Sequence, residues 1–304
     1  MATYIIGDMI HEARVKGGYS QEELSFGICS LSSLSRIENN LQVPSKKIFD
    51  ALIEKLGVSD YAYNMYVSKE EMELYALSHK ITRKLSVLDF ENLEELTKEF
   101  EQKIGEKNGL DFQYLLFTKA LIAKHKGQKD EEVLKLLMSA LHLTMANFNI
   151  DDLEERRLIT FAEISILNNI GMLYYEMGKK QEGLKILFWL VNHMDNHLMD
   201  EEEKAKKYPM ILYNISKRIG DGGRNKDAYE LSEKGVKMCI EYGKLHPLPY
   251  LMVNKGCAAA ELGRKEEAAV VFDQAFSLFA ILGKQNMLDK LKAEVKKRYN
   301  IHMS

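Results

Sequence analysis

The fold is decided by residues 20–44, whose sequence is SQEELSFGICSLSSLSRIENNLQVP. Ser20 is a favourable helix N-cap, and Glu23 three residues later completes a capping box for a short helix. That helix should end near Gly27. Ser30 can cap a second helix, because a serine side chain accepts hydrogen bonds from the first free backbone N–H groups. The stretch therefore predicts two short helices joined by a tight turn, which is a helix-turn-helix.

The second of these helices should have an apolar edge and a polar edge. Leu34 and Ile37 stand three residues apart and should face the core. The outer edge carries serine, leucine and arginine, which can hydrogen-bond to bases, contact a thymine methyl group and pair with guanine. This chemistry suits the major groove, so we expect a double-stranded DNA operator as a partner, although exposed serines are also common on short helices. The predicted DNA-binding residues are Gln21, Ser30, Leu31, Ser32, Ser35, Arg36, Lys46 and Lys47.

The same stretch resembles the lambda-repressor-like (XRE) helix-turn-helix family. The shared pattern is Gln21, a leucine three residues on, Ser-Arg-Ile-Glu-Asn at 35–39 and Pro-Ser at 44–45. The turn is one residue shorter than is usual in that family, and Asn40 stands where a glycine is common. This shortened form is similar to that of the peptide-pheromone-responsive regulators of the PlcR and Rgg type. The resemblance implies DNA binding by the first domain and, on the concave face of C-terminal repeats, asparagines that hold the main chain of a short signalling peptide.

Amphipathic segments flank the helix-turn-helix. One precedes it at 6–13, and another follows Ser45. Five short helices ending near residue 67 would complete a small domain, so we expect a DNA-binding domain at 1–67 and a second domain at 68–304. Residues 1–67 hold six Lys and Arg against eight Asp and Glu, so their non-specific DNA affinity should be weak. We therefore expect a homodimer that binds a two-part operator.

The composition is that of a soluble globular protein. The chain has 304 residues, of which 46% are hydrophobic and 29% charged, and its four prolines favour long helices. No apolar run approaches the ~20 residues of a membrane span, and the first residues lack the features of a signal peptide, so we expect a cytoplasmic protein with no membrane partner. The three cysteines are scattered without a CxxC pair, so neither a disulfide framework nor a thiolate zinc site is indicated.

An internal repeat dominates the chain beyond residue 70. Copies that combine a helix, a glycine turn and a second helix occur at 114–137, 167–184, 212–229 and 253–269. Their turn glycines are Gly127, Gly178, Gly223 and Gly263, with spacings of 51, 45 and 40 residues. These spacings exceed the ~34 residues of a standard tetratricopeptide repeat, so the helices or their connections must be longer. The pattern predicts an all-α, tetratricopeptide-like α-solenoid, with a degenerate first copy at 74–103 and a capping helix at 284–299.

One polar position recurs in the repeats without a packing reason. Asn169, Asn214 and Asn254 each stand nine residues before a turn glycine. Seven residues after these asparagines stand Glu176, Asp221 and Glu261. Seven residues make about two helical turns, so the amide and the acid share one face of each first helix. An amide offers a donor and an acceptor together, as an extended peptide backbone requires, so we expect a short linear peptide as ligand. The acids would favour a peptide of cationic character.

The predicted peptide-binding residues are Asn169, Asn214, Asn254, Asn168, Tyr213, Lys217, Tyr250, Glu176, Asp221 and Glu261. A structural explanation stays open, because such asparagines also hydrogen-bond to neighbouring helices and acids near helix ends are commonly solvated. A groove for an extended peptide should show asparagines without intramolecular partners, whereas a protein-docking face should show a broad exposed apolar patch.

No catalytic residues are predicted. His193 and His197 have a spacing that can bind a metal, but no HExxH motif accompanies them. The glycine-rich sequence at 220–225 lacks the lysine and the strand of a phosphate-binding loop. No nucleophile with an adjacent base and no pair of carboxylates stands out. We therefore expect neither enzymatic activity nor a metal or other cofactor.

Together these patterns predict a sequence-specific transcription regulator of the quorum-sensing type. A peptide bound to the repeats would shift the dimer between DNA-binding states. Two alternatives stay open. One is a DNA-tethered scaffold or antagonist that uses the repeats to hold another protein, and the other is a ligand-free repressor whose asparagines are satisfied inside the protein.

Overall fold

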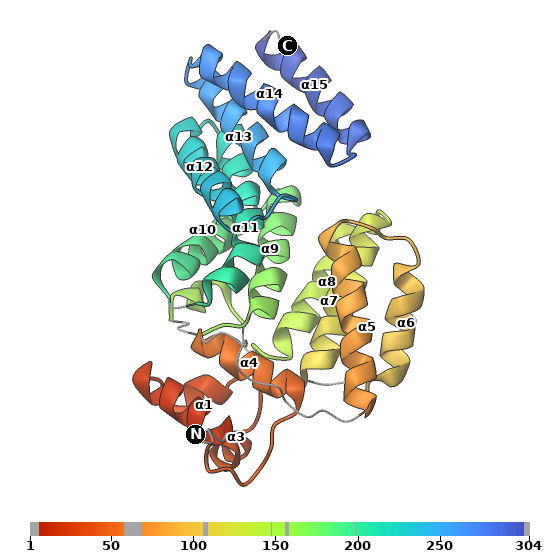
Figure 1. The fold of residues 1–304 in the computed structure, drawn as a ribbon, viewed down its shortest axis with the longest axis vertical. Helices are drawn as coiled ribbons and strands as arrows, with labels where there is room; N and C mark the ends of the chain where they lie inside the picture. Colours follow the sequence, from red (N-terminus) through yellow and green to blue (C-terminus); the bar gives the residue numbers. More distant parts are fainter. Residues whose placement is uncertain are drawn as a thin grey trace. The chain divides into compact units, whose positions relative to one another are not determined.

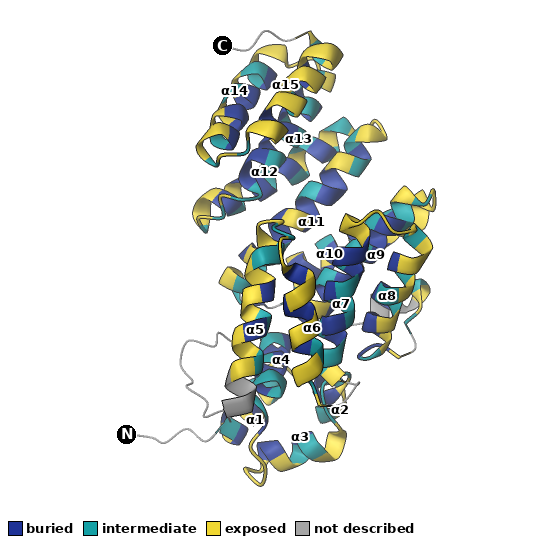
Figure 2. Ribbon diagram, turned by 90° about the vertical axis from the view of Figure 1, so that its right-hand side faces the viewer, coloured by how far each residue is buried: buried dark blue, intermediate teal, exposed yellow. Residues whose placement is uncertain are grey.

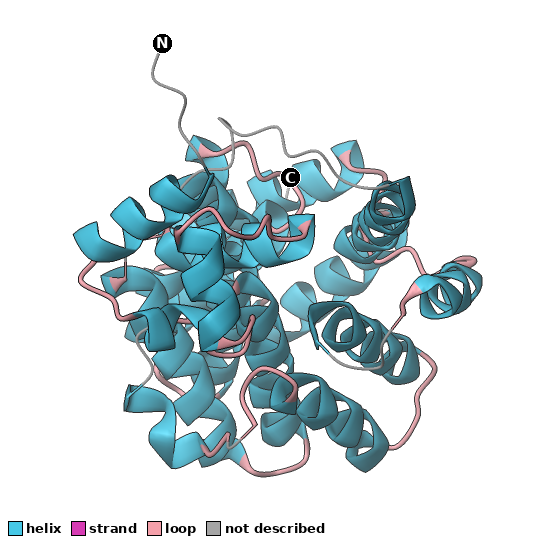
Figure 3. Cartoon of the chain, turned by 90° about the horizontal axis from the view of Figure 1, so that it is seen from below, coloured by secondary structure: helices cyan, strands magenta, loops and turns pink. Residues whose placement is uncertain are grey.

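The structure is a computed structural model that describes residues 6–57, 69–105, 109–146, 148–155, 158–197 and 199–300. Within these ranges the chain forms helices joined by loops, with no strand (Figure 3). It divides into two compact units, Met1–Asp200 and Glu201–Ser304. None of the described helices is long and apolar enough to cross a bilayer.

The predicted helix-turn-helix is present with its predicted caps. The first four helices are α1 (Ile6–Lys16), α2 (Gln21–Ser25), α3 (Leu31–Glu38) and α4 (Lys46–Leu56). The Ser20 Oγ atom accepts from the backbone N–H of Glu23 at 3.1 Å, and the Glu23 carboxylate accepts from the N–H of Ser20 at 2.8 Å. The side chains of Ser30 and Ser45 likewise accept from the backbone N–H groups of Ser33 and Ile48 and so cap α3 and α4. These local hydrogen bonds set where each short helix begins.

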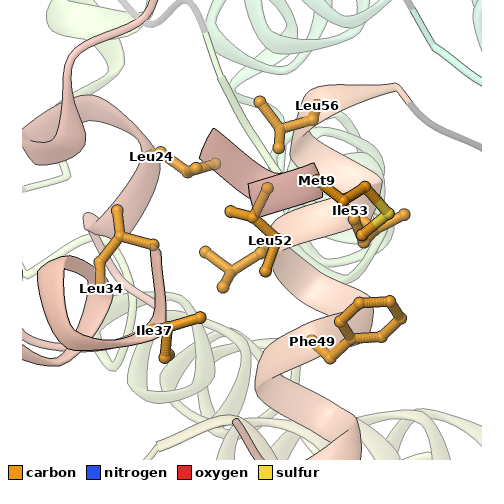
Figure 4. Packing of buried hydrophobic residues seen from close by; sticks show 9 residues of the cluster. Met9, Leu24, Leu34, Ile37, Phe49, Leu52, Ile53 and Leu56 are labelled. Atoms are coloured by element: carbon orange, nitrogen blue, oxygen red, sulfur yellow. The ribbon is translucent and has the colours of Figure 1, made fainter. Parts of the chain in front are cut away.

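A small apolar core holds these four helices together (Figure 4). Its buried members are Met9, Ile10, Leu24, Leu34, Ile37, Phe49, Leu52, Ile53 and Leu56. Every helix contributes at least one side chain, and burying each large apolar side chain stabilises the domain by about 1.5–3 kcal/mol. The predicted fifth helix and the predicted boundary at residue 67 lie outside the described residues.

The helices from α5 to α14 follow one another as pairs, and α15 follows the last pair (Figure 1). In the first unit they are α5 (Lys69–Ser86), α6 (Leu93–Lys103), α7 (Gly109–His125), α8 (Asp130–His142), α9 (Phe161–Glu176) and α10 (Lys180–Asn196), with a 3-10 helix at Ile150–Glu155. In the second unit they are α11 (Glu201–Asp221), α12 (Asn225–Glu241), α13 (Leu248–Glu261), α14 (Lys265–Ile281) and α15 (Gln285–Tyr299). The four predicted turn glycines join the helices of a pair with φ between 70° and 89°, a left-handed geometry that favours glycine.

Small residues allow the two helices of a pair to pack closely. A Cβ atom on Gly183 of α10 would lie 2.5 Å from the carbonyl oxygen of Gly171 in α9. In the second unit, a Cβ atom on Gly256 would lie 2.6 Å from the ring of Phe272. Buried residues accordingly line the faces where paired helices meet, and exposed residues cover the opposite faces (Figure 2). The predicted fold class, a helix-turn-helix domain followed by a tetratricopeptide-like array, is confirmed.

Candidate functional site

The outer face of α3 presents the side chains that could contact bases. Leu31 is 50% exposed, and Ser32 and Arg36 are exposed beside it. Ser35 is half-buried, and the Ser30 Oγ atom accepts from the Ser33 N–H at 3.1 Å as the helix cap. Leu31, Ser32 and Arg36 therefore form the accessible part of the predicted reading face.

A buried carboxylate holds α3 against α1 and α2. The Glu38 side chain is 2% exposed and accepts from Arg14 Nε at 2.6 Å and from Gln21 Nε2 at 2.7 Å. His11 Nδ1 also lies 3.0 Å from this carboxylate. Burial alone would raise the pKa of Glu38, but the hydrogen bonds from Arg14, Gln21 and His11 outweigh it and lower the pKa to about 2. Gln21, predicted to contact DNA, thus has a structural partner within the domain.

Lys46 and Lys47 of α4, both predicted to bind DNA, are paired with acids in this structure. Lys46 forms an ion pair with Asp50 one turn later, and Lys47 forms one with Asp111 of α7. Both lysines are half-buried, and burial lowers the pKa of Lys47 although the Asp111 carboxylate opposes the shift. Lys47 must leave Asp111 before it can contact a phosphate.

Replacing Asp111 by Asn should therefore strengthen non-specific DNA binding. An ion pair of this exposure contributes little to stability, so releasing Lys47 should raise the affinity by about two- to fivefold at low salt. Fluorescence anisotropy with a random-sequence duplex measures this change. Glu131→Gln removes an equal charge from an exposed position of α8 and serves as control. An equal gain in both variants would show that only net charge changed.

The second unit contains a groove where most of the predicted peptide-binding residues meet. It has a volume of about 230 Å³ and lies between α11, α13 and α15. The predicted residues that line it are Tyr213, Lys217, Asp221, Tyr250, Asn254 and Glu261. Asn214 does not line this groove and is 8% exposed.

Asn254 lies in this groove with one side of its amide already engaged. Its Nδ2 atom donates to the backbone oxygen of Tyr213 at 3.0 Å and to Ser216 Oγ at 2.9 Å. Its Oδ1 atom accepts no hydrogen bond from the described residues. Tyr213 and Tyr250 form an edge-to-face pair with their ring centroids 5.8 Å apart. The groove thus offers an acceptor, lysines and aromatic rings, among them those of Tyr213 and Tyr250.

Two acids of the groove, Asp221 and Glu261, converge on an arginine of α15. Glu261 Oε1 accepts from Arg298 Nη2 at 2.8 Å and from Nε at 3.2 Å. Asp221 Oδ1 lies 3.9 Å from Arg298 Nη1. The predicted acid position therefore has an internal cationic partner.

The remaining predicted peptide-binding residues belong to α9 in the first unit. Asn169 Nδ2 donates to the backbone oxygen of Ser165 at 2.8 Å, one turn back in the same helix. Glu176 accepts from Lys124 of α7 at 2.8 Å. Asn168 is half-buried and has a partner of its own. Asn169 and Glu176 are thus engaged within the first unit. Since Asn214 and Asn254 also have partners, the three asparagines do not show the unpartnered state expected of a groove for an extended peptide.

The sequence prediction missed the contribution of α15 to the groove. This helix supplies Met287, Lys290, Leu291, Glu294, Arg298 and Tyr299. The sequence held a signal for a helix at this position. Gly283, whose φ is 68°, follows α14 and precedes a lysine, just as Gly263 precedes an arginine before α14. The predicted capping helix is α15, and its side chains also line the groove.

The histidines weighed as a metal site have a packing role. His193 is 2% exposed and stacks on Trp189 and His197, with ring centroids 4.9 and 4.0 Å away. Burial, with a smaller contribution from His197, lowers the pKa of His193 to about 3. The part of the chain that the structure describes contains no group of three His, Cys, Asp or Glu placed to hold a metal ion.

Two family models match the chain. Residues 10–61 match a helix-turn-helix family, and residues 79–301 match the RNPP family C-terminal domain. The chain belongs to the RNPP family. No curated protein matches its sequence. The predicted relationship to the regulators of the PlcR and Rgg type is thereby confirmed.

Solved structures share the RNPP fold along almost the whole chain. PlcR of Bacillus thuringiensis, in complex with the peptide PapR7 and DNA, is 19% identical with a TM-score of 0.61, and the match covers 95% of this chain and 99% of that chain. ComR from S. thermophilus, in complex with DNA and its signalling peptide ComS, is 17% identical with a TM-score of 0.52, and the match covers 95% and 98%. Apo ComR from Streptococcus vestibularis is 16% identical with a TM-score of 0.57, covering 96% and 97%. At these identities the likeness concerns the fold.

Proposed function

We propose that this RNPP-family protein is a sequence-specific transcription regulator whose repeats bind a short linear signalling peptide. The peptide shifts a homodimer between states with different operator affinity. Residues 1–67 are the DNA-binding domain, and residues 68–304 bind the peptide and hold the dimer. The observation that carries the proposal is the groove of the second unit, where Asn254, two tyrosines and two acids meet beside α15.

The DNA-binding part of the proposal rests on α3. Its accessible side chains, Leu31, Ser32 and Arg36, have the chemistry of base readout, and Glu38 anchors the helix from behind. Two such domains reach successive major grooves only when their recognition helices stand about 34 Å apart. A ligand alters binding only if it favours one separation of the two domains over another.

The peptide-binding part rests on the groove and on the relatives. A free amide oxygen on Asn254 can accept from a peptide N–H, and the tyrosine rings can cover apolar side chains. PlcR was solved with the peptide PapR7 and DNA, and ComR with DNA and its signalling peptide ComS. These complexes share the fold of this chain, and by fold-level analogy they support a peptide as its ligand.

A second observation favours a protein partner as the alternative function. Ile240, Val270 and Ile281 of α12 and α14 are 67%, 57% and 79% exposed. All three belong to the second unit, where an exposed apolar surface would suit protein docking. A scaffold would use this surface and leave the groove empty.

Native mass spectrometry of the protein mixed with a cytosolic peptide extract from its source distinguishes these functions. The proposal predicts that the wild type retains a short peptide and that Asn254→Ala loses it. Asn196→Ala, which removes an exposed amide from α10, is the matched control and should retain the peptide. Retention of a folded protein partner with no peptide would favour the scaffold.

Replacing Arg36 by Ala should weaken operator binding by about 1–3 kcal/mol, because a paired base edge would lose its partner. An operator obtained by in vitro selection and fluorescence anisotropy provide the measurement. Arg83→Ala, at an exposed position of α5, removes the same charge and should change affinity little. A loss that is equal on operator and random DNA would assign Arg36 to phosphate contacts instead.

A further inference from the structure

We propose that Asp221 and Glu261 form a subsite for a cationic group of the ligand, and that Arg298 occupies this subsite in the free protein. The inference rests on the proposed function, because it assigns one end of the peptide groove. It adds an internal competitor that the ligand must displace. The cation is the ammonium group of a lysine or of the peptide N-terminus, or an arginine side chain.

The geometry brings two carboxylates from different helices to one cation. Glu261 closes α13 and Asp221 closes α11, and both lie within 4 Å of the Arg298 guanidinium, at 2.8 and 3.9 Å. All three residues line the groove that also holds Asn254. A single incoming cation at this position would therefore face both carboxylates at once.

Because these side chains are partly exposed, displacing Arg298 from the two carboxylates should cost little free energy. The side chains of Arg298, Glu261 and Asp221 are 45%, 35% and 47% exposed. Ion pairs of this exposure contribute little to stability and weaken further with salt. A ligand cation would also leave no carboxylate unpaired when the guanidinium moves into solvent. The exchange replaces the contact of Arg298 with the carboxylates by a contact of the ligand cation with the same carboxylates.

The attachment of α15 also permits movement. Of its fifteen residues, only Leu288 and Val295 are buried. Tyr299, next to Arg298, packs against Phe272 with ring centroids 6.2 Å apart, and the guanidinium carbon lies 5.2 Å from the Tyr299 ring. Displacement of Arg298 would thus act on a helix that has few other anchors. Occupancy of the subsite and the position of α15 are thereby coupled.

The same turn of α15 provides a matched control. Lys297 is exposed and makes no ion pair with any described residue. Lys297→Gln removes one positive charge beside the groove without vacating the subsite. Arg298→Gln removes the same charge and vacates it. The two variants therefore distinguish the effect of vacating the subsite from the general effect of removing one positive charge near the groove.

The test uses two synthetic heptapeptide mixtures that are acetylated at the N-terminus and randomised over apolar residues. They differ at one fixed central position, which is lysine in the first mixture and, in the second, norleucine, an uncharged analogue that lacks the terminal amine. Native mass spectrometry measures how much peptide the full-length wild type, Arg298→Gln and Lys297→Gln retain. A thermal melt of each variant confirms that it is folded.

We expect Arg298→Gln to retain about three- to fivefold more of the lysine mixture than the wild type, with no such gain for the norleucine mixture. Lys297→Gln should behave like the wild type. Peptide retention that does not depend on Arg298, or an equal gain for both mixtures, would overturn the subsite while leaving the peptide groove in place. No retention of either mixture by any of the three proteins would contradict the peptide-binding function itself.

Discussion

Replacing Glu38 by Ala should destabilise the helix-turn-helix domain by about 3–5 kcal/mol, because it leaves the largely buried guanidinium of Arg14 without its carboxylate partner. The Glu38 side chain is 2% exposed and that of Arg14 is 11% exposed. Gln21 and His11 would lose the same acceptor. Hydrogen exchange of the amides in α1 to α4 measures the effect locally. Operator binding should fall with the folded fraction of the domain.

The control for this change is Glu12→Ala, an exposed acid on α1. It should alter stability by less than about 0.5 kcal/mol. The pKa of Glu38 falls from 4.5 to about 2 on folding, so its contribution to stability is complete above pH 4.5 and declines as the pH falls towards 2. Glu38→Ala should remove this part of the acid sensitivity. An unchanged acid profile would mean that Glu38 does not hold α3.

Replacing Phe272 by Ala should destabilise the second unit by about 3–5 kcal/mol through loss of buried area and creation of a cavity. Phe272 is 0% exposed and packs beneath Gly256 and Tyr299. Its loss would remove the surface on which the last residues of α15 rest. Hydrogen exchange in α13 to α15 measures the loss of stability.

Gln274→Ala on the exposed face of α14 is the control for Phe272 and should leave exchange in these helices unchanged. Peptide retention provides a second readout, since the groove needs α15 in place. A Phe272→Ala variant with normal exchange and normal retention would show that α15 is held by contacts other than this aromatic pair.

Local signals in the sequence were sufficient for most of the fold. The capping box of Ser20 and Glu23 and the turn glycines act within a few residues, so their pattern predicts the helix boundaries. The small residues of the repeats likewise predict close helix pairs, as Gly256 over Phe272 shows. Such features depend little on the rest of the chain.

The partners of polar side chains could not be predicted in the same way. Periodicity placed Glu261 and Asn254 on one helix face, but their contacts come from Arg298 and Tyr213, 37 and 41 residues away in sequence. The link between Lys47 and Asp111 spans 64 residues. The partners of long, flexible side chains are set only after the helices have packed. Residue spacing therefore predicts the helix face on which a side chain lies but not the residue with which it pairs.

The central claim is that peptide binding and operator binding are coupled in one protein. The most direct measurement is operator affinity by anisotropy, with and without a saturating amount of the peptide retained in native mass spectrometry. We expect operator affinity to change by about 5- to 150-fold, with a reciprocal change of the same factor in peptide affinity when operator is present. Equal operator affinity with and without the bound peptide would contradict it.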